Sequence, residues 1–113
     1  MKLKIVGSGG MSIISSSFCK CKICQEARQK GGRYERLGPS LYIDDIKMLI
    51  DTPEEIAVAC NRQNITEVKH LSISHSDPDH VKGMRIVENQ RLVSPYWRTD
   101  EVVINNDLYL LQR

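Results

Sequence analysis

The sequence lacks any long hydrophobic run. The longest uninterrupted apolar stretch covers only the five residues 56–60, whereas a membrane-spanning helix needs about 20. Residues 1–7 have a basic start but no apolar core of the length that a secretory signal requires. We therefore expect a soluble, cytoplasmic protein that does not enter a membrane.

An excess of charge of one sign is also missing. The 16 basic and 14 acidic residues leave a formal net charge of +2. A surface that coats a polyanion is therefore excluded as the main function, and nucleic acid is not an expected partner. Leu, Ile, Val and Phe together make up 30 of the 113 residues, which is above the level typical of disordered chains. The length fits one small folded domain.

Cysteine is scarce and unevenly placed. Three of the four cysteines, Cys19, Cys21 and Cys24, form a C-x-C-x-x-C cluster, and Cys60 stands alone. A secreted disulfide scaffold would have more cysteines, spread along the chain. Three thiolates can share one tetrahedral ion at ~2.3 Å, so a metal site is favoured, with free or redox-active thiols as the alternative. Cys60 is expected to be a small buried residue on the inner face of a helix.

The apolar pattern predicts mixed α and β structure with one sheet. Strands are expected at residues 2–6, 40–44, 47–51 and 68–74, the second and third forming a hairpin, with a terminal hairpin from 101–104 and 108–111. One helix is expected over 21–30, ended by two glycines, and a short one over 81–89. A third helix should start with Thr52 as N-cap and Pro53 at its first position, end within 61–64, and turn Ile56, Ala57, Ala59 and Cys60 inward.

Four potential metal ligands, His75, Asp77, Asp79 and His80, follow the predicted strand 68–74 within six residues. A loop at the end of a buried strand is a common place for a binding site. Imidazoles together with carboxylates suit zinc, manganese or iron. A polar surface turn, in which an aspartate caps the next helix, is the alternative for any one of them. The four together favour a metal site.

Residues 74–83, with the sequence SHSDPDHVKG, resemble the H-x-H-x-D-H signature of the metallo-β-lactamase-fold hydrolases and the glycine that follows it. Residues 49–52, LIDT, are similar to the strand-end aspartate segment that precedes the first helix in that superfamily. The opening strand with GSGG at 7–10, followed by the cysteine cluster, resembles one branch in particular. That branch contains the cyclic phosphodiesterase of the carbon–phosphorus lyase pathway and the pyrroloquinoline-quinone biosynthesis B protein.

The resemblance implies an α+β fold, half of a metallo-β-lactamase-like αββα sandwich, with one mixed sheet and flanking helices. Residues 1–113 would form a single partial domain, of which 84–113 is an atypical C-terminal segment. The implied function is that of a metal-dependent hydrolase acting on small-molecule phosphoesters. Its catalytic cofactors would be zinc, manganese or iron, with up to two ions when a partner completes the site. The cysteine cluster would hold one structural zinc.

The resemblance also assigns roles to single residues. His75 would bind the first metal, Asp79 and His80 would bind the second, and Asp79 would orient the attacking water. Asp51 would hydrogen-bond a ligand histidine. Asp77 stands where the signature has its second histidine, which shifts the metal preference toward harder ions such as manganese. This departure weakens the case for hydrolysis more than the case for metal binding.

Histidine is absent beyond position 80, because the chain has only His70, His75 and His80. A complete two-metal hydrolase of this type draws further histidines and a bridging aspartate from its second half, and the cysteine site of that branch takes a downstream histidine. The first hypothesis is therefore the N-terminal half of a hydrolase of the phosphodiesterase type, with or without activity as an isolated chain; the second is a non-catalytic metal-binding or partner-binding module. Half a sandwich leaves an apolar face and unpaired edges, so we expect a homo-oligomer.

Overall fold

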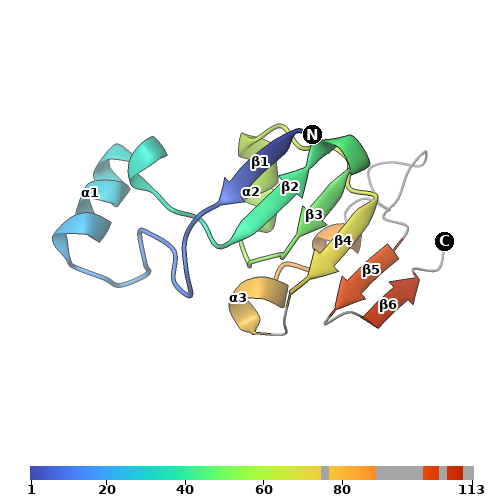
Figure 1. Ribbon diagram of the computed structural model, residues 1–113. Coiled ribbons are helices and arrows are strands. Elements are labelled where there is room, and N and C mark those ends of the chain that lie inside the picture. Colours follow the sequence, from blue (N-terminus) through green and yellow to red (C-terminus); the bar gives the residue numbers. More distant parts are fainter. Residues whose placement is uncertain (75–76, 89–100, 105–106, 111–113) are drawn as a thin grey trace.

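A single mixed sheet forms the body of the protein (Figure 1). The structure is a computed structural model, and it describes residues 1–74, 77–88, 101–104 and 107–110. Neighbouring strands follow chain order, antiparallel from β1 to β3, parallel from β3 to β5, and antiparallel again between β5 and β6. The strands are β1 (Leu3–Gly7), β2 (Ser40–Ile43), β3 (Met48–Ile50), β4 (His70–Ile73), β5 (Glu101–Ile104) and β6 (Asp107–Leu110).

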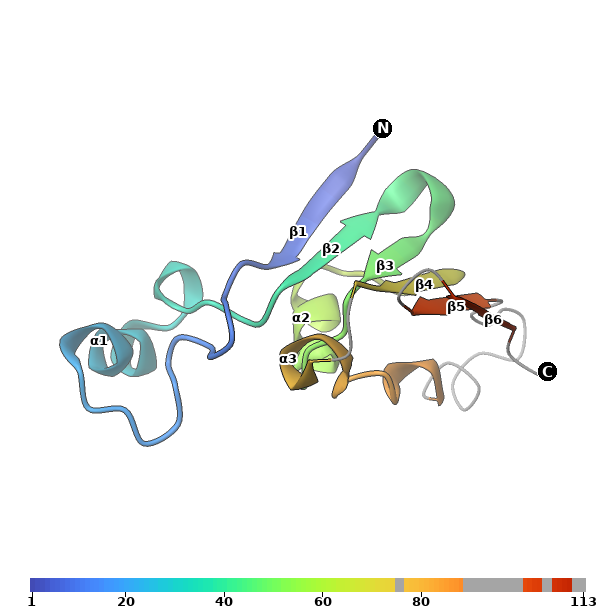
Figure 2. The same ribbon diagram turned by 60° about the horizontal axis from the view of Figure 1, so that its bottom comes forward.

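Helices lie on one side of this sheet and at one end of it. The α-helices are α1 (Lys22–Lys30), α2 (Ile56–Arg62) and α3 (Pro78–Val81), and the short 3-10 helices are η1 (Gly32–Tyr34) and η2 (Asp44–Ile46). Figure 2 shows α2 and α3 on the same side of the sheet, with α1 set apart beyond the end of β1. In the described part of the chain, no helix is long and apolar enough to cross a membrane.

The core fills the space between the sheet and α2. Side chains alternate along the strands, so one face carries Val6, Tyr42, Leu49, Leu71 and Ile73, all buried. From α2, three residues at i, i+3 and i+4 spacing meet this face: Ile56, Ala59 and Cys60. The buried position of Cys60, only 4% exposed, confirms its predicted role as a small core residue.

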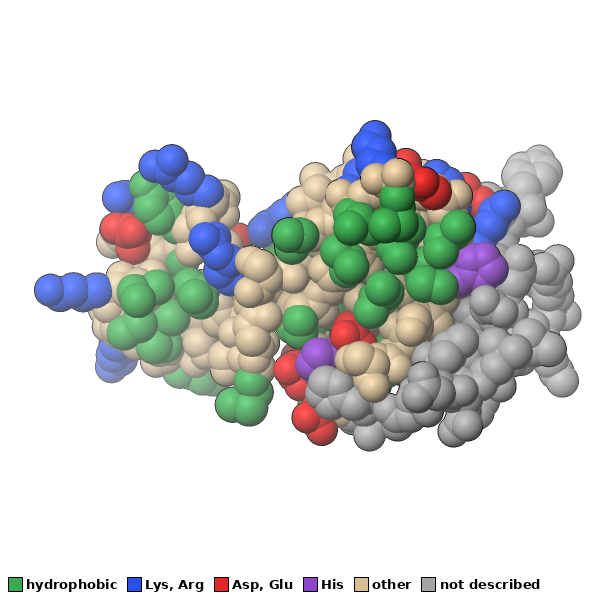
Figure 3. All heavy atoms as spheres, in the orientation of Figure 1, with side chains coloured by type: hydrophobic (Ala, Val, Ile, Leu, Met, Phe, Trp, Pro, Cys, Tyr) green, Lys and Arg blue, Asp and Glu red, His purple; other side chains and the backbone are tan. Residues whose placement is uncertain are grey.

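The opposite face of β1–β3 carries apolar side chains in two rows that run across the strands. The pairing aligns Leu3 with Ile43 and Met48 in one row, and Ile5 with Leu41 and Ile50 in the other. None of these six belongs to the core cluster or packs against it. Leu3 is 50% and Ile5 68% exposed, and Figure 3 shows hydrophobic side chains gathered over β1–β3 on this face. The sheet therefore has one covered face and one apolar face that no described helix covers.

The start of α2 differs from the prediction, which placed the N-cap at Thr52. The helix begins four residues later, at Ile56, with Glu55 at the N-cap and no capping side chain. Thr52 is engaged elsewhere: its N–H and Oγ1 donate to the carbonyl of His80, at 2.8 and 3.3 Å. The prediction that Ala57 faces inward is also wrong: it follows Ile56 by about 100° around the helix, away from the face that Ile56, Ala59 and Cys60 form, and it is exposed.

The helix predicted over 81–89 is present only in part: α3 covers Pro78–Val81, residues 82–85 form turns, and residues 86–88 are helical again. Proline suits the first helical position because its φ is fixed near the helical value and no N–H bond is lost there. The other elements were predicted well. The hairpin of β2 and β3, the terminal hairpin of β5 and β6, and α1 with its end at Gly31, where φ is 61°, are confirmed.

Candidate functional site

The ends of two parallel strands bring the predicted site residues together. Asp51 follows β3 directly and Ser74 follows β4 directly, and the two strands are paired in parallel. The N–H of Asp51 donates to the carbonyl of Ser72 at 2.8 Å, so the pairing continues past the end of β3. The carboxyl ends of adjacent parallel strands are where α/β folds commonly bind ligands.

Asp51 holds two neighbours with one carboxylate. Its Oδ1 accepts from the N–H of Ser74 at 2.8 Å, and the Ser74 hydroxyl donates to the same carboxylate at 2.9–3.0 Å. Its Oδ2 lies 2.9 Å from Nδ1 of His80. The side chain is largely buried, and the backbone of Asp51 has φ of 65°, a region that aspartate tolerates better than most residues. The structure thus places Asp51 beside a predicted ligand histidine, the arrangement that the resemblance implied.

His80 lies on α3 and presents its second ring nitrogen to Asp79. With Nδ1–H donating to Asp51, Nε2 carries the lone pair, and it lies 3.3 Å from Oδ2 of Asp79. Two donors on one tetrahedral zinc ion, each at 2.0–2.1 Å, would be about 3.4 Å apart. The separation of these two atoms therefore matches that of two ligands on one metal ion.

The other two predicted ligands are Asp77 and His75. Asp77 is exposed at the N-cap position of α3, and its side chain makes no capping bond there. Among the described residues it does not join Asp79 and His80 in a group of three ligand atoms. His75 lies outside the described residues. The structure therefore brings together two of the four ligands predicted in this loop, with Asp51 behind them.

A cleft of about 260 Å³ opens beside Asp79. It is bordered by Pro78 and Asp79 on one side and by residues of the loop after β1, including Gly10, on the other. That loop is pinned where the N–H of Gly9 donates to the carbonyl of Leu37 at 2.6 Å. Gly10 thus lines the cleft, and the residues that follow it do not begin a helix.

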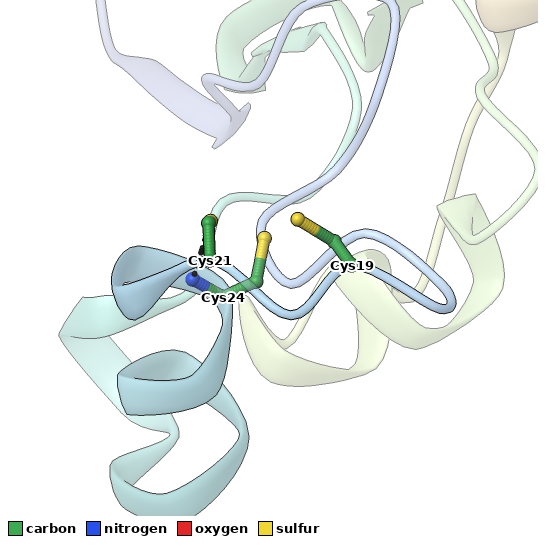
Figure 4. Close-up of side chains that lie close together, drawn as sticks. All are labelled: Cys19, Cys21 and Cys24. Carbon is green, nitrogen blue, oxygen red and sulfur yellow. Dashed lines mark hydrogen bonds between the residues drawn. The ribbon is translucent and has the colours of Figure 1, made fainter.

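The three clustered cysteines form a second candidate site, which adjoins the cleft through Ser16, a lining residue whose N–H donates to Sγ of Cys24. Their sulfur atoms all lie within 4.8 Å of one another (Figure 4). Cys21 is the N-cap of α1, Cys24 lies in its first turn, and Cys19 comes from the preceding loop. Three thiolates on a tetrahedral zinc ion at ~2.3 Å would have sulfur atoms about 3.8 Å apart. The cluster therefore needs shifts of about 1 Å or less to hold an ion.

Hydrogen bonds to sulfur make these thiols unequal. The N–H of Cys24 donates to Sγ of Cys21 at 3.4 Å, and this bond, helped by the thiols of Cys19 and Cys24, lowers the pKa of Cys21 to about 7. The pKa of Cys24 is raised. The hydrogen bond from the N–H of Ser16 lowers this pKa, but burial and the neighbouring thiols together raise it by more. Cys21 is therefore the thiol that ionises most readily, which favours metal binding.

Sequence reasoning missed three supporting residues. Ser74 was quoted only as part of a motif, yet it donates twice to Asp51. Thr52 was assigned to a helix cap, yet it ties the segment after β3 to His80. Arg28, one turn after Cys24, bonds the loop that carries Cys19. Only Arg28 carried a usable signal, the i, i+4 spacing from a predicted ligand.

Comparison with solved structures identifies the fold. No family model and no curated protein matches the chain. The chain is similar to a new diphosphatase from the PhnP family, with 25% identity and a TM-score of 0.66, over 80% of this chain and 36% of that one. It has the fold of half a metallo-β-lactamase domain. A second structure with this fold, Zn²⁺-bound PqqB from Methylobacterium extorquens, matches with 20% identity and a TM-score of 0.66, over 74% of this chain and 32% of that one.

These matches confirm the predicted metallo-β-lactamase fold and its α+β class. The chain spans about a third of the length of the two solved structures. The second structure contains zinc, and in the part of this chain that the structure describes, the cysteine cluster is a group that could hold a metal ion. The assignment of single residues as ligands remains a prediction.

Proposed function

We propose that this chain is a cytoplasmic, metal-binding part of a metallo-β-lactamase-fold hydrolase that acts on phosphoesters. The observation that supports this most is the array Asp51–His80–Asp79. It joins a ring nitrogen held by a buried carboxylate to a second carboxylate 3.3 Å away, beside a cleft. Nitrogen and oxygen donors in this arrangement suit zinc, manganese or iron.

Each residue of the array has a separate task in this proposal. Asp51 fixes the tautomer and the orientation of the His80 ring, which keeps Nε2 directed at Asp79. His80 and Asp79 would hold the ion, with His75 and Asp77 as further ligands from the same loop. A bound divalent ion would lower the pKa of a water and stabilise charge on a phosphoester oxygen. Asp79, which lines the cleft, would orient the attacking water.

A second candidate function is a non-catalytic metal-binding module. The specific observation in its favour is the cysteine cluster, whose three sulfur atoms come from one short segment and not from Asp51, Asp79 or His80. In this case a zinc ion at Cys19, Cys21 and Cys24 would stabilise α1 and the loop before it. The two functions share metal binding and differ in turnover.

Metal content and turnover measured on the same preparations distinguish the candidates. Metal per chain would be determined after loading with zinc or manganese, and hydrolysis of bis(p-nitrophenyl) phosphate would be followed. The hydrolase proposal expects turnover that His80→Ala abolishes and the matched control His70→Ala, at the opposite end of β4, retains. Bound metal without turnover would support the module. A chain that retains no metal at either site would overturn both.

We propose that copies of this chain associate through the open face of the sheet. The rows that begin at Leu3 and Ile5 are apolar and carry no charge that would oppose self-association. We expect a homodimer or larger assembly, which Ile5→Glu should dissociate. Light scattering at micromolar concentration provides the measurement, and a monomeric wild type would contradict the proposal.

A further inference from the structure

The loop that carries Cys19 is attached to α1 by one guanidinium group. Arg28 Nη2 donates to the carbonyl of Ser16 at 2.9 Å and also to the carbonyl of Cys19. The N–H of Cys19 donates back to the carbonyl of Ser16 at 3.2 Å, which closes the loop into a turn. Arg28 therefore bonds both ends of the turn from which Cys19 projects.

Few other contacts fix the position of Cys19. Within the turn, Phe18 is 97% exposed and has φ of 69°, so no apolar packing holds the segment there. The N–H of Ser16 donates to Sγ of Cys24 at 3.4 Å, which anchors the first end of the turn to α1. The second end, at Cys19, is joined to α1 through Arg28.

Charge gives Arg28 a second effect. Three thiolates around a divalent ion carry a net charge of −1, and Arg28 places a permanent positive charge one helical turn after Cys24. Bringing three thiolates together costs repulsion, which a nearby cation reduces. The side chain is exposed, so solvent weakens this effect and the clamp on the two carbonyls is the larger contribution.

We propose that Arg28 is a positioning residue for the three-cysteine metal site, holding the Cys19 loop so that its thiolate meets those of Cys21 and Cys24. The inference rests on the metal binding proposed above and extends it to a residue outside the ligand set. Residues that orient metal ligands commonly change affinity 10–100-fold when they are replaced.

The test compares Arg28→Met with the wild-type chain in a cobalt(II) titration. The thiolate-to-cobalt charge-transfer band reports how many sulfur atoms bind, and competition with a chelator gives the zinc affinity. Arg28→Met is expected to bind zinc about 10–100-fold more weakly and to show a reduced band per cobalt. Arg28→Lys keeps the charge but loses the longer, planar guanidinium whose Nη2 reaches both carbonyls, so it should restore only part of the affinity.

The control is Lys30→Met, which removes a cation from the same helix, where the lysine pairs with exposed Glu26 and lies over the ring of Tyr34. This variant should bind as the wild type does. Wild-type affinity and an unchanged band in both Arg28 variants would overturn the inference. A wild type that binds neither cobalt nor zinc would instead refute the proposed metal site. Should Arg28→Met lose α1, as seen by circular dichroism, the Arg28→Lys result decides, and full affinity there contradicts the clamp.

Discussion

Replacing Asp51 by asparagine should destabilise the fold far more than its small change in shape suggests. The carboxylate accepts from the N–H and hydroxyl of Ser74 and meets Nδ1 of His80 at 2.9 Å. Asparagine keeps one acceptor oxygen and places an NH₂ group where the second oxygen was. Hydrogen bonds to charged groups are each worth about 1.5–3 kcal/mol, so losing one to two of them should lower the free energy of unfolding by about 1.5–6 kcal/mol.

Urea unfolding followed by far-UV circular dichroism measures this loss. Asparagine is the right replacement because it tolerates the φ of 65° at this position, whereas alanine would add about 1–2 kcal/mol of backbone strain. The control is Glu26→Gln, the same acid-to-amide change in an exposed pair with Lys30, expected to cost under about 0.5 kcal/mol. If Asp51→Asn were as stable as Glu26→Gln, the central role given to Asp51 would be refuted.

Three further predictions use other features of the structure. Gly83→Ala should lower the free energy of unfolding by about 2–3 kcal/mol, because the added Cβ would meet a backbone carbonyl. Gly10→Ala, which has open space around it, should change this free energy by less than about 0.5 kcal/mol. Thermal unfolding of both variants tests this. Burial raises the pKa of Tyr42 from 10 to about 12, so the unfolded chain ionises this hydroxyl first. Its contribution to stability, up to ~3 kcal/mol, should be lost between pH 10 and 12, and urea unfolding should show that part of the alkaline decline missing in Tyr42→Phe. The pKa of Cys21 is lowered to about 7, whereas burial raises the pKa of Cys60 to about 11. In metal-free protein at pH 7, iodoacetamide should therefore label Cys21 well before Cys60. Equal labelling of the two cysteines by mass spectrometry would contradict this.

Local signals in the sequence were enough for the strands and for α1. Alternating apolar residues placed β2 and β3, and two glycines ended α1 where φ becomes positive. The start of α2 was missed because Thr52–Pro53–Glu54–Glu55 reads as a capping box, which is a local pattern. In the structure Thr52 bonds His80, 28 residues later, and this distant contact outweighs the cap. A tertiary bond of that kind leaves no trace in the pattern of neighbouring residues.

The candidate site shows the same division between local and distant information. The loop motif put Asp79 and His80 in one place because both lie on one short segment, and the structure brings their donor atoms to 3.3 Å. The contact between Asp51 and His80 joins residues after two different strands, and the sequence alone reached it only through resemblance to a family. What makes that contact possible is the parallel pairing of β3 and β4, which aligns Ile50 with Ser72 and so brings the residues that follow to the same edge. Sheet topology, more than the motif itself, therefore turns separate residues into a site.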